Sequence, residues 1–262
     1  MTRAFLHYEP RATHQLDAMI ALGAGLARHG VHIDISPATD SAKRADFIAW
    51  WGDKVPAVLR DKPRLILEAG YINGRSGDYV KDRLRFVSVG WNGLHGCADP
   101  GPLDCPPDRW EAIGVKLRPW RTEGNYILIC DQHPGDSVSP GNRSWWVAAL
   151  DEAEPDMRLS SIYRPHPLMA NDMGPLSQSL RDAAMCVTWS STAALEAVCL
   201  GVPTVALNRG SMAWEVTSHS VSEPPYLGER EQWAYNLAYR QWTHDELKDG
   251  SAWPHLRAGL NT

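Results

Sequence analysis

The residues best suited to chemistry lie in the stretch 163–207. Arg164 and His166 belong to an Arg-Pro-His-Pro run, and a hydroxyl-rich Ser-Ser-Thr turn at 190–192 precedes a predicted helix over 193–200. The start of a helix carries unpaired N–H groups and the positive end of the helix dipole, which favour an anion. A phosphate over this turn would therefore meet amides and hydroxyls together.

Glu196 lies about one turn into the same predicted helix, where its carboxylate could accept hydrogen bonds from ribose hydroxyls. Gly201 closes the helix, and Pro203 introduces a strand over 204–207. Two structural alternatives stay open. The Ser-Ser-Thr turn could serve only as a helix cap, and His166 between two prolines could be a rigid loop residue.

Short strands that alternate with helices must position these groups. In the first half, strands are predicted at 4–8, 31–35, 47–51, 64–68 and 86–89, with a helix over 13–28. In the second half, strands are predicted at 126–130, 159–163, 185–189 and 204–207, with helices over 143–154, 176–184 and 193–200. This alternation is typical of parallel sheets, and the Pro- and Gly-rich stretch 96–119 is predicted to be an irregular connection.

The order His-Pro, Ser-Ser, an Ala-Leu-Glu-Ala helix and Gly-X-Pro resembles the C-terminal half of GT-B glycosyltransferases, and capsule and Kdo-type transferases in particular. The resemblance implies an α/β, GT-B-like fold of two Rossmann-like lobes with parallel sheets and a cleft between them. It also implies a nucleotide sugar as co-substrate. Its phosphates would be held by His166 with Arg164, Ser190, Ser191 and Thr192, and its ribose by Glu196.

A second match is Leu67-Glu68-Ala69-Gly70-Tyr71, which is similar to the Glu-Asp-Gly-Phe type of motif in the N-terminal half of related transferases. The resemblance implies that Glu68 is the catalytic base, although Ala69 stands where a second acid often occurs. A single carboxylate acting on the acceptor would invert the sugar carbon. Alternatively, Glu68 is a structural partner of Arg64 or Arg75.

The loop 131–137 follows the first strand of the second half, where an open sheet presents its carboxyl end to a ligand. Gly135 would allow close approach of the backbone, and Gln132 and Ser137 could donate hydrogen bonds to a phosphate or a sugar hydroxyl. An ordinary polar turn is the alternative. We expect Gln132, Gly135 and Ser137 to border the donor.

Three parts are expected from these patterns: an acceptor-side lobe over 1–121, a nucleotide-sugar lobe over 122–228, and a C-terminal helical segment over 229–262 that returns to the first lobe. Residues 1–121 carry 17 Lys and Arg against 14 Asp and Glu, and the remainder carries 9 against 17. The first lobe is therefore the basic one, and its excess is concentrated between Lys54 and Arg85.

The basic stretch raises the question of the acceptor. It could follow a phosphate backbone, and 86–96 resembles phage-encoded transferases. A hydroxymethylated pyrimidine extruded from duplex DNA could then be read beside Glu68, with Tyr71, Arg75, Trp91 and Asn92 as acceptor-binding residues. A solvated basic face is the bland alternative. Other open alternatives are a capsule or surface saccharide as acceptor, a sugar-nucleotide epimerase, and a nucleotide-binding module without chemistry.

Composition limits the expectations for a metal, a cofactor and the cellular location. The sequence contains neither an Asp-X-Asp pair nor a Cys-X-X-Cys pair, so we expect metal-independent chemistry without a cofactor beyond the nucleotide sugar. UDP-glucose or another UDP-hexose is favoured by the wider family, and a CMP-linked sugar is compatible with the motifs. No apolar run reaches membrane-spanning length, so a cytoplasmic protein is expected, in a host cytoplasm if phage-encoded. The oligomeric state stays open.

Overall fold

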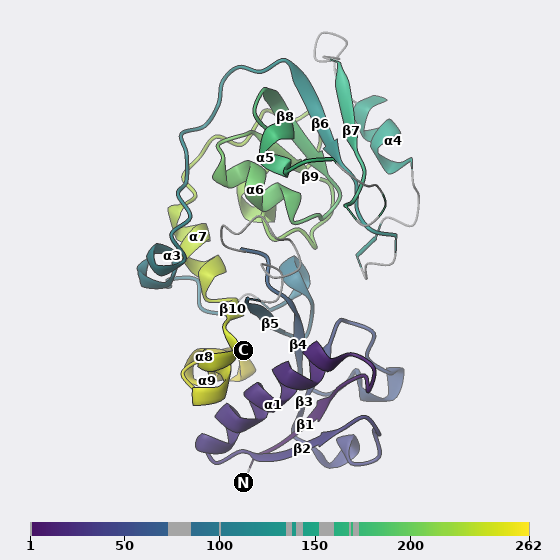
Figure 1. The fold of residues 1–262 in the computed structure, drawn as a ribbon, viewed down its shortest axis with the longest axis vertical. Coiled ribbons are helices and arrows are strands. Elements are labelled where there is room, and N and C mark those ends of the chain that lie inside the picture. Colours follow the sequence, from purple (N-terminus) through teal and green to yellow (C-terminus); the bar gives the residue numbers. More distant parts are fainter. Residues whose placement is uncertain are drawn as a thin grey trace. The chain divides into compact units, whose positions relative to one another are not determined.

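The computed structural model describes residues 2–72, 85–99, 101–134, 138–139, 144–151, 160–167, 169 and 173–261. Contacts divide the chain into unit 1, Met1–Ile113 with Tyr235–Thr262, and unit 2, Gly114–Ala234 (Figure 1). The first boundary therefore falls before the division expected at residue 121. The reason is that the backbone N–H groups of Arg118 and Arg121 donate to the carbonyl oxygens of Cys199 and Gly201, at 2.9 and 2.7 Å.

Unit 1 is built on a six-stranded sheet in the order β10-β5-β4-β3-β1-β2. Its strands are β1 (Arg3–His7), β2 (His32–Ser36), β3 (Phe47–Trp51), β4 (Arg64–Ala69), β5 (Val87–Trp91) and β10 (Gln241–Trp242). The first four are parallel, as expected, but β5 runs antiparallel to β4 and β10 runs antiparallel to β5. The parallel sheet expected in this half therefore carries an antiparallel edge, formed by β5 and β10.

The helices of unit 1 come from both ends of the chain. Those in the described residues are α1 (Thr13–Arg28), α3 (Asp108–Ile113), α8 (His244–Asp249) and α9 (Trp253–Ala258), with short 3₁₀ turns at Ala42–Arg44, Ala57–Leu59, His95–Cys97 and Gly259–Asn261. Helix α1 lies against α8 so closely that a Cβ on Gly25 would stand 1.9 Å from the carbonyl oxygen of Leu247. Glycine at position 25 therefore permits this packing.

The apolar pattern over 229–250 predicts one continuous helix, but the structure divides this C-terminal segment. Helix α7 (Glu231–Ala238) ends before β10, and α8 then starts at a capping box in which Thr243 and Glu246 satisfy each other's backbone N–H groups. Tertiary pairing of β10 with β5 overrides the helical pattern, because the backbone N–H of Val89 and the carbonyl of Arg240 join the two segments at 2.9 Å.

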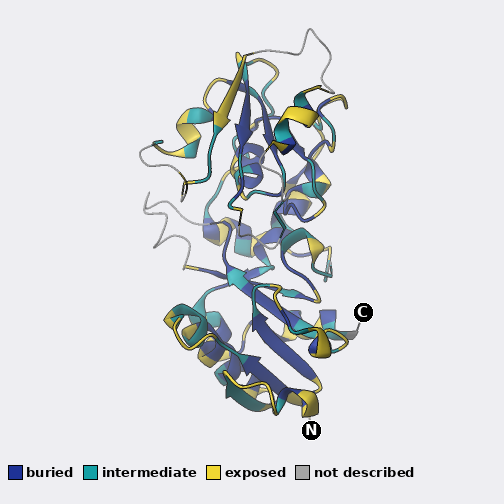
Figure 2. Cartoon of the chain, turned by 90° about the vertical axis from the view of Figure 1, so that its right-hand side faces the viewer, coloured by how far each residue is buried: buried dark blue, intermediate teal, exposed yellow. Residues whose placement is uncertain are grey.

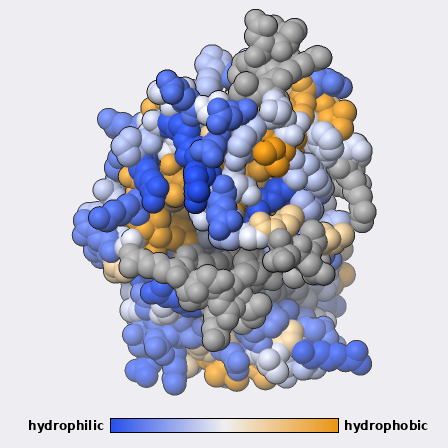
Figure 3. All heavy atoms as spheres, turned by 45° about the horizontal axis from the view of Figure 1, so that its top comes forward, coloured by the Kyte–Doolittle hydropathy of each residue, from blue (hydrophilic) through white to orange (hydrophobic). Residues whose placement is uncertain are grey.

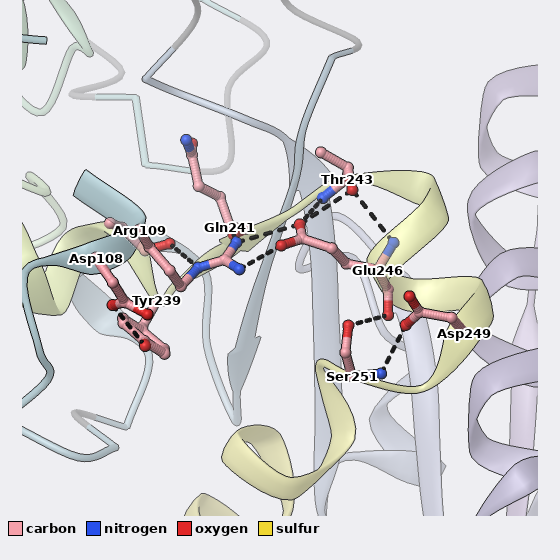
Figure 4. Close-up of polar contacts among 9 residues, drawn as sticks. Asp108, Arg109, Tyr239, Gln241, Thr243, Glu246, Asp249 and Ser251 are labelled. Atoms are coloured by element: carbon pink, nitrogen blue, oxygen red, sulfur yellow. Dashed lines mark hydrogen bonds and ion pairs between the residues drawn. The ribbon is translucent and has the colours of Figure 1, made fainter. Parts of the chain in front are cut away.

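Within unit 1, Arg109 on α3 contacts this segment directly (Figure 4). Its guanidinium donates to both carboxylate oxygens of Glu246 and, at 2.8 Å, to the carbonyl of Gln241. It also lies over the Trp242 ring, 3.9 Å from the ring centroid. The Tyr239 hydroxyl donates to the Asp108 carboxylate at 2.9 Å. Charge, hydrogen bonds and ring contact therefore hold β10 and α8 together.

Unit 2 contains a four-stranded, wholly parallel sheet in the order β7-β6-β8-β9. Its strands are β6 (Tyr126–Cys130), β7 (Ser161–Arg164), β8 (Ala183–Thr188) and β9 (Thr204–Ala206); its helices are α4 (Trp145–Asp151), α5 (Leu176–Ser179) and α6 (Ala193–Cys199), with a 3₁₀ turn at Trp214–Val216. The helix predicted over 176–184 is shorter because β8 already begins at Ala183. Strand β7 is the exposed edge strand, drawn yellow in Figure 2.

Each sheet is covered by apolar side chains that alternate between its two faces. In unit 2, Ile129 and Val187 face one cluster, whereas Leu128 and Cys186 face the other.

Hydrophilic residues cover much of the face in Figure 3, with smaller hydrophobic groups between them. Along the described parts of the chain, no helix combines the length and apolar character that crossing a membrane requires.

Candidate functional site

The carboxyl ends of β6, β7 and β8 bring together residues far apart in the sequence. Gln132 and His133 follow β6, His166 follows β7, and Ser190 follows β8. The three strands are neighbours and parallel, so their carboxyl ends form one edge of the sheet. Ligands of open α/β sheets bind at such edges. We call these four residues the β6–β8 edge cluster.

Gln132 and Ser190 form the buried base of the β6–β8 edge cluster. Their exposed fractions are 8% and 7%. The side-chain oxygen of Gln132 accepts hydrogen bonds from the Ser190 backbone N–H at 3.1 Å and the Ser190 hydroxyl at 2.8 Å. The two donors of Ser190 on which a phosphate was expected are therefore already bound to Gln132, which locks the loop after β6 to the turn after β8.

His133 and His166 face each other at the same edge. Their ring centroids lie 5.5 Å apart, with an angle of 68° between the ring planes. Both side chains are half-buried. Asp131 lies just before the first of these histidines, and its carboxylate accepts hydrogen bonds from the Trp145 indole at 3.0 Å and from the Tyr163 hydroxyl. The loop that carries His133 is thus anchored at its start.

Arg164 lies at the end of β7, but its guanidinium points to the chain that follows. It donates to the carbonyl oxygens of Met173 and Gly174, at 3.0 and 2.6 Å, and to the Ser179 hydroxyl at 2.8 Å. These bonds tie the segment before α5 to the sheet. Arg164 therefore has a structural task in addition to the phosphate contact expected from the sequence.

Glu196 and the hydroxyl turn lie at the start of α6. The Ser191 hydroxyl accepts a hydrogen bond from the Ala193 N–H at 3.3 Å, and Thr192 is exposed. Glu196 reaches the surface, yet the surrounding protein removes enough water from its carboxyl to raise its pKa, against the lowering effects of Arg164 and of a backbone hydrogen bond from Ser177. Gly135 and Ser137 lie outside the described residues, as does Arg75.

Glu68 lies at the carboxyl end of β4 in unit 1. One carboxylate oxygen accepts a hydrogen bond from the Ala69 N–H at 2.9 Å, and the other is 3.9 Å from the point where a Cβ of Gly52 would stand. Gly52 has φ of 67°, a conformation that favours glycine. A residue without a side chain therefore lies next to the carboxylate.

An aromatic pair lies on the same face of this sheet as Glu68. Trp50 and Ile66 face one apolar cluster, and strand alternation puts Glu68 on that face too. The His7 ring stacks on Trp50 with centroids 3.6 Å apart and an angle of 3° between the rings. Burial lowers the pKa of His7, against the raising effects of the Pro37 backbone and of Glu9. The half-buried imidazole of His7 thus covers one face of the Trp50 ring.

Three of the expected acceptor residues, Trp91, Tyr71 and Asn92, have structural tasks. Trp91 is only 4% exposed, and its indole N–H donates to the carbonyl of Leu256 at 2.6 Å, so neither ring face is open for a base to stack on. Tyr71 is buried, its hydroxyl donates to the carbonyl of Leu237 at 3.3 Å, and burial raises its pKa. Asn92, with φ of 59°, shapes the turn after β5 and accepts a hydrogen bond from the Arg64 N–H at 3.0 Å.

Comparison with known proteins shows which fold this architecture resembles. Residues 153–220 match the family described as "Putative glycosyltransferase (DUF6716)". Among solved structures, the chain is similar to the beta Kdo 2,7 transferase of Thermosulfurimonas dismutans KpsC, with 12% identity and a TM-score of 0.57 over 96% of this chain and 99% of that chain. The beta Kdo 2,4 transferase of the same KpsC gives 14% identity and a TM-score of 0.55 over 92% of both chains. The chain has a GT-B-like α/β fold. No curated protein sequence matches it.

Within this GT-B-like fold, the family match spans His166, Ser190 and Glu196 but not the loop after β6. Sequence reasoning did not select His133 as a site residue, although a signal was present: both β6 and β7 are followed by a His-Pro pair. Nor did it select His7. Across the described residues, no three His, Cys, Asp or Glu side chains gather in a way that could hold a metal ion.

Proposed function

We propose that this protein is a glycosyltransferase that moves a sugar from a nucleotide sugar to a hydroxyl acceptor. The observation that carries the proposal is the β6–β8 edge cluster, in which Gln132, His133, His166 and Ser190 meet at the ligand-binding edge of a parallel sheet. The matched family and the likeness to Kdo transferases support the same activity.

The chemistry needs two tasks from the protein. A base must take the proton of the acceptor hydroxyl, and donors must stabilise the negative charge that builds up on the departing phosphate. We assign the first task to Glu68 and the second to His166. As the acceptor oxygen bonds to the sugar carbon, the electron pair of the broken C–O bond passes to the phosphate, and direct attack of this kind inverts that carbon.

For the acceptor, a saccharide is now favoured over DNA. On the face of Glu68, the buried Trp50 ring supports the half-buried ring of His7, and the outer side of a flat ring such as His7 can pack against the C–H face of a sugar. The burial of Trp91 removes the ring proposed for stacking a DNA base. The likeness to Kdo transferases points in the same direction. A hydroxymethylated pyrimidine in DNA is the second candidate, because basic residues are dense between Lys54 and Arg85.

The resemblance to the wider family favours the choice of donor. A UDP-hexose such as UDP-glucose is the first donor to test, and a CMP-linked sugar is the second. Purified protein would be incubated with each donor and either a capsule-type oligosaccharide or duplex DNA that contains hydroxymethylcytosine. Mass analysis of the acceptor would then detect an added sugar.

Sugar added to the oligosaccharide, and lost in His166→Ala, would support the proposal. Addition to the DNA alone would select the second candidate. Turnover of the donor to an epimer without any acceptor would refute transfer, and donor binding that survives without transfer to either acceptor would identify a binding module instead.

A further inference from the structure

We propose that His133 is a second phosphate-binding residue and works as a pair with His166 on one phosphoryl group of the nucleotide. The inference rests on the proposed function, because it needs a nucleotide at the β6–β8 edge cluster. It adds a residue that the motifs in the sequence did not assign.

The strand register brings the two histidines together. Cys130 at the end of β6 is the partner of Arg164 at the end of β7, and the Asp131 N–H donates to the Arg164 carbonyl at 2.9 Å just beyond them. His133 and His166 follow within a few residues, each with a proline after it. Proline restricts the backbone of the residue before it to extended conformations, so both imidazoles are held on short, stiff connections.

The spacing of the two rings suits one phosphoryl group. Their centroids are 5.5 Å apart, and the rings are set edge to face at 68°. An N–H donor stands about 2.9 Å from a phosphate oxygen. Rings this close leave no room for a phosphoryl group between them, but two neighbouring imidazoles can each donate to a different oxygen of one group that lies beside the pair.

Hydrogen bonds of neighbouring residues hold the two loops that carry the imidazoles. The Ser190 N–H and hydroxyl donate to Gln132, and the Arg164 guanidinium donates to Met173, Gly174 and Ser179. Gln132 directly precedes His133, and Arg164 lies two residues before His166. Both sets of bonds therefore help to fix the positions of the two rings.

The experiment measures the binding of UMP, CMP and UDP by calorimetry, with uridine and cytidine as phosphate-free probes. The variants are His133→Gln and His166→Gln, with His133→Arg as a variant that keeps donor groups. The control is His32→Gln, since His32 is an exposed histidine in unit 1. Loss of a hydrogen bond to a charged group corresponds to about a tenfold loss of affinity or more.

We expect both glutamine variants to bind the nucleotides at least about tenfold more weakly, to bind the nucleosides as the wild type does, and to melt normally. His133→Arg should retain nucleotide affinity. Wild-type affinity in His133→Gln, beside a loss in His166→Gln, would overturn the pairing. An equal loss of nucleoside and nucleotide affinity would also overturn it, because that result indicates a structural role. If the wild type binds none of the nucleotides, the proposed function itself fails.

Discussion

Gln132 joins two loops by accepting two hydrogen bonds from one residue, Ser190, through a single side-chain oxygen. The pair is buried, so the Ser190 N–H depends on this oxygen rather than on water. The Ser190 hydroxyl also lies 3.3 Å from the carbonyl of Val138. The shape of the β6–β8 edge cluster therefore depends on an amide that the sequence indicated only as a possible ligand contact.

Replacing Gln132 by Leu should destabilise the protein. The change leaves the Ser190 N–H without its acceptor, and an unsatisfied buried donor costs about 1–3 kcal/mol. Urea unfolding would measure this loss, with Gln178→Leu as a control because Gln178 is an exposed glutamine of the same unit. We also expect weaker nucleotide binding. A Gln132→Leu protein as stable as the control would contradict the proposed role of the pair.

Glu68→Gln should abolish transfer and leave donor binding intact. The amide keeps the size of the side chain but cannot accept the acceptor proton, and loss of a general base costs about 10²–10⁴ in rate. Turnover and nucleotide affinity would be measured in parallel, with Glu111→Gln as a matched control because Glu111 is an exposed glutamate of unit 1. If donor binding and transfer fell equally in Glu68→Gln, Glu68 would not be the base.

Breaking the contact of Arg109 with Glu246 should loosen the C-terminal segment. Partial burial acts to raise the pKa of Glu246, but hydrogen bonds from Arg109 and Thr243 outweigh it and lower the pKa. Loss of hydrogen bonds to a charged group costs about 1.5–3 kcal/mol, so Glu246→Gln should reduce the free energy of unfolding by that order.

A double-mutant cycle with Arg109→Met separates this contact from other effects. The two substitutions should be less than additive, because each removes the same contact. Hydrogen exchange at Gln241 and Trp242 should also become faster. Additive losses would show that the two side chains act independently.

Acid should destabilise the protein through two histidines. Burial lowers the pKa of His95 and of His255 to about 4, and for His255 the nearby charges of Arg109 and Arg240 lower it further. An unfolded histidine titrates at about 6.5, so the unfolded state binds more protons between these values. The free energy of unfolding should therefore fall as pH falls through this window, by at most about 3 kcal/mol for each group.

Urea unfolding from about pH 7 to about pH 4.5 would measure this dependence. His95→Asn and His255→Gln, which do not titrate in this range, should each flatten the curve. Asparagine suits position 95 because φ there is 55°. An unchanged slope in both variants would show that other groups govern the acid response.

Much of the fold could be predicted from apolar periodicity. The helix over 13–28 and the strands over 47–51 and 126–130 have the predicted bounds, because each is long or apolar enough to dominate its surroundings. The direction of β5 could not be predicted, since a run of alternating residues is the same in parallel and antiparallel pairing. The break of the C-terminal helical pattern at β10 likewise depends on distant residues, notably Val89.

For the candidate site, residue types indicated where the site lies in the fold more reliably than what each side chain does. His166 and Gln132 lie where the motifs indicated, at the carboxyl edge of a parallel sheet. Trp91 was chosen for its ring, but local sequence does not reveal that Leu256 accepts its N–H from far along the chain. Such long-range partners separate a residue that stabilises the fold from one that binds a ligand.

Unit 1 is formed by two separate segments of the chain, and this has a consequence for biosynthesis. Its sheet needs β10, which is translated only after the whole of unit 2 has been translated. Domains generally fold as units while the chain is made. Unit 2 should therefore complete its fold before unit 1 does. The first strands of unit 1 are translated earlier, but their sheet is incomplete until β10 is added.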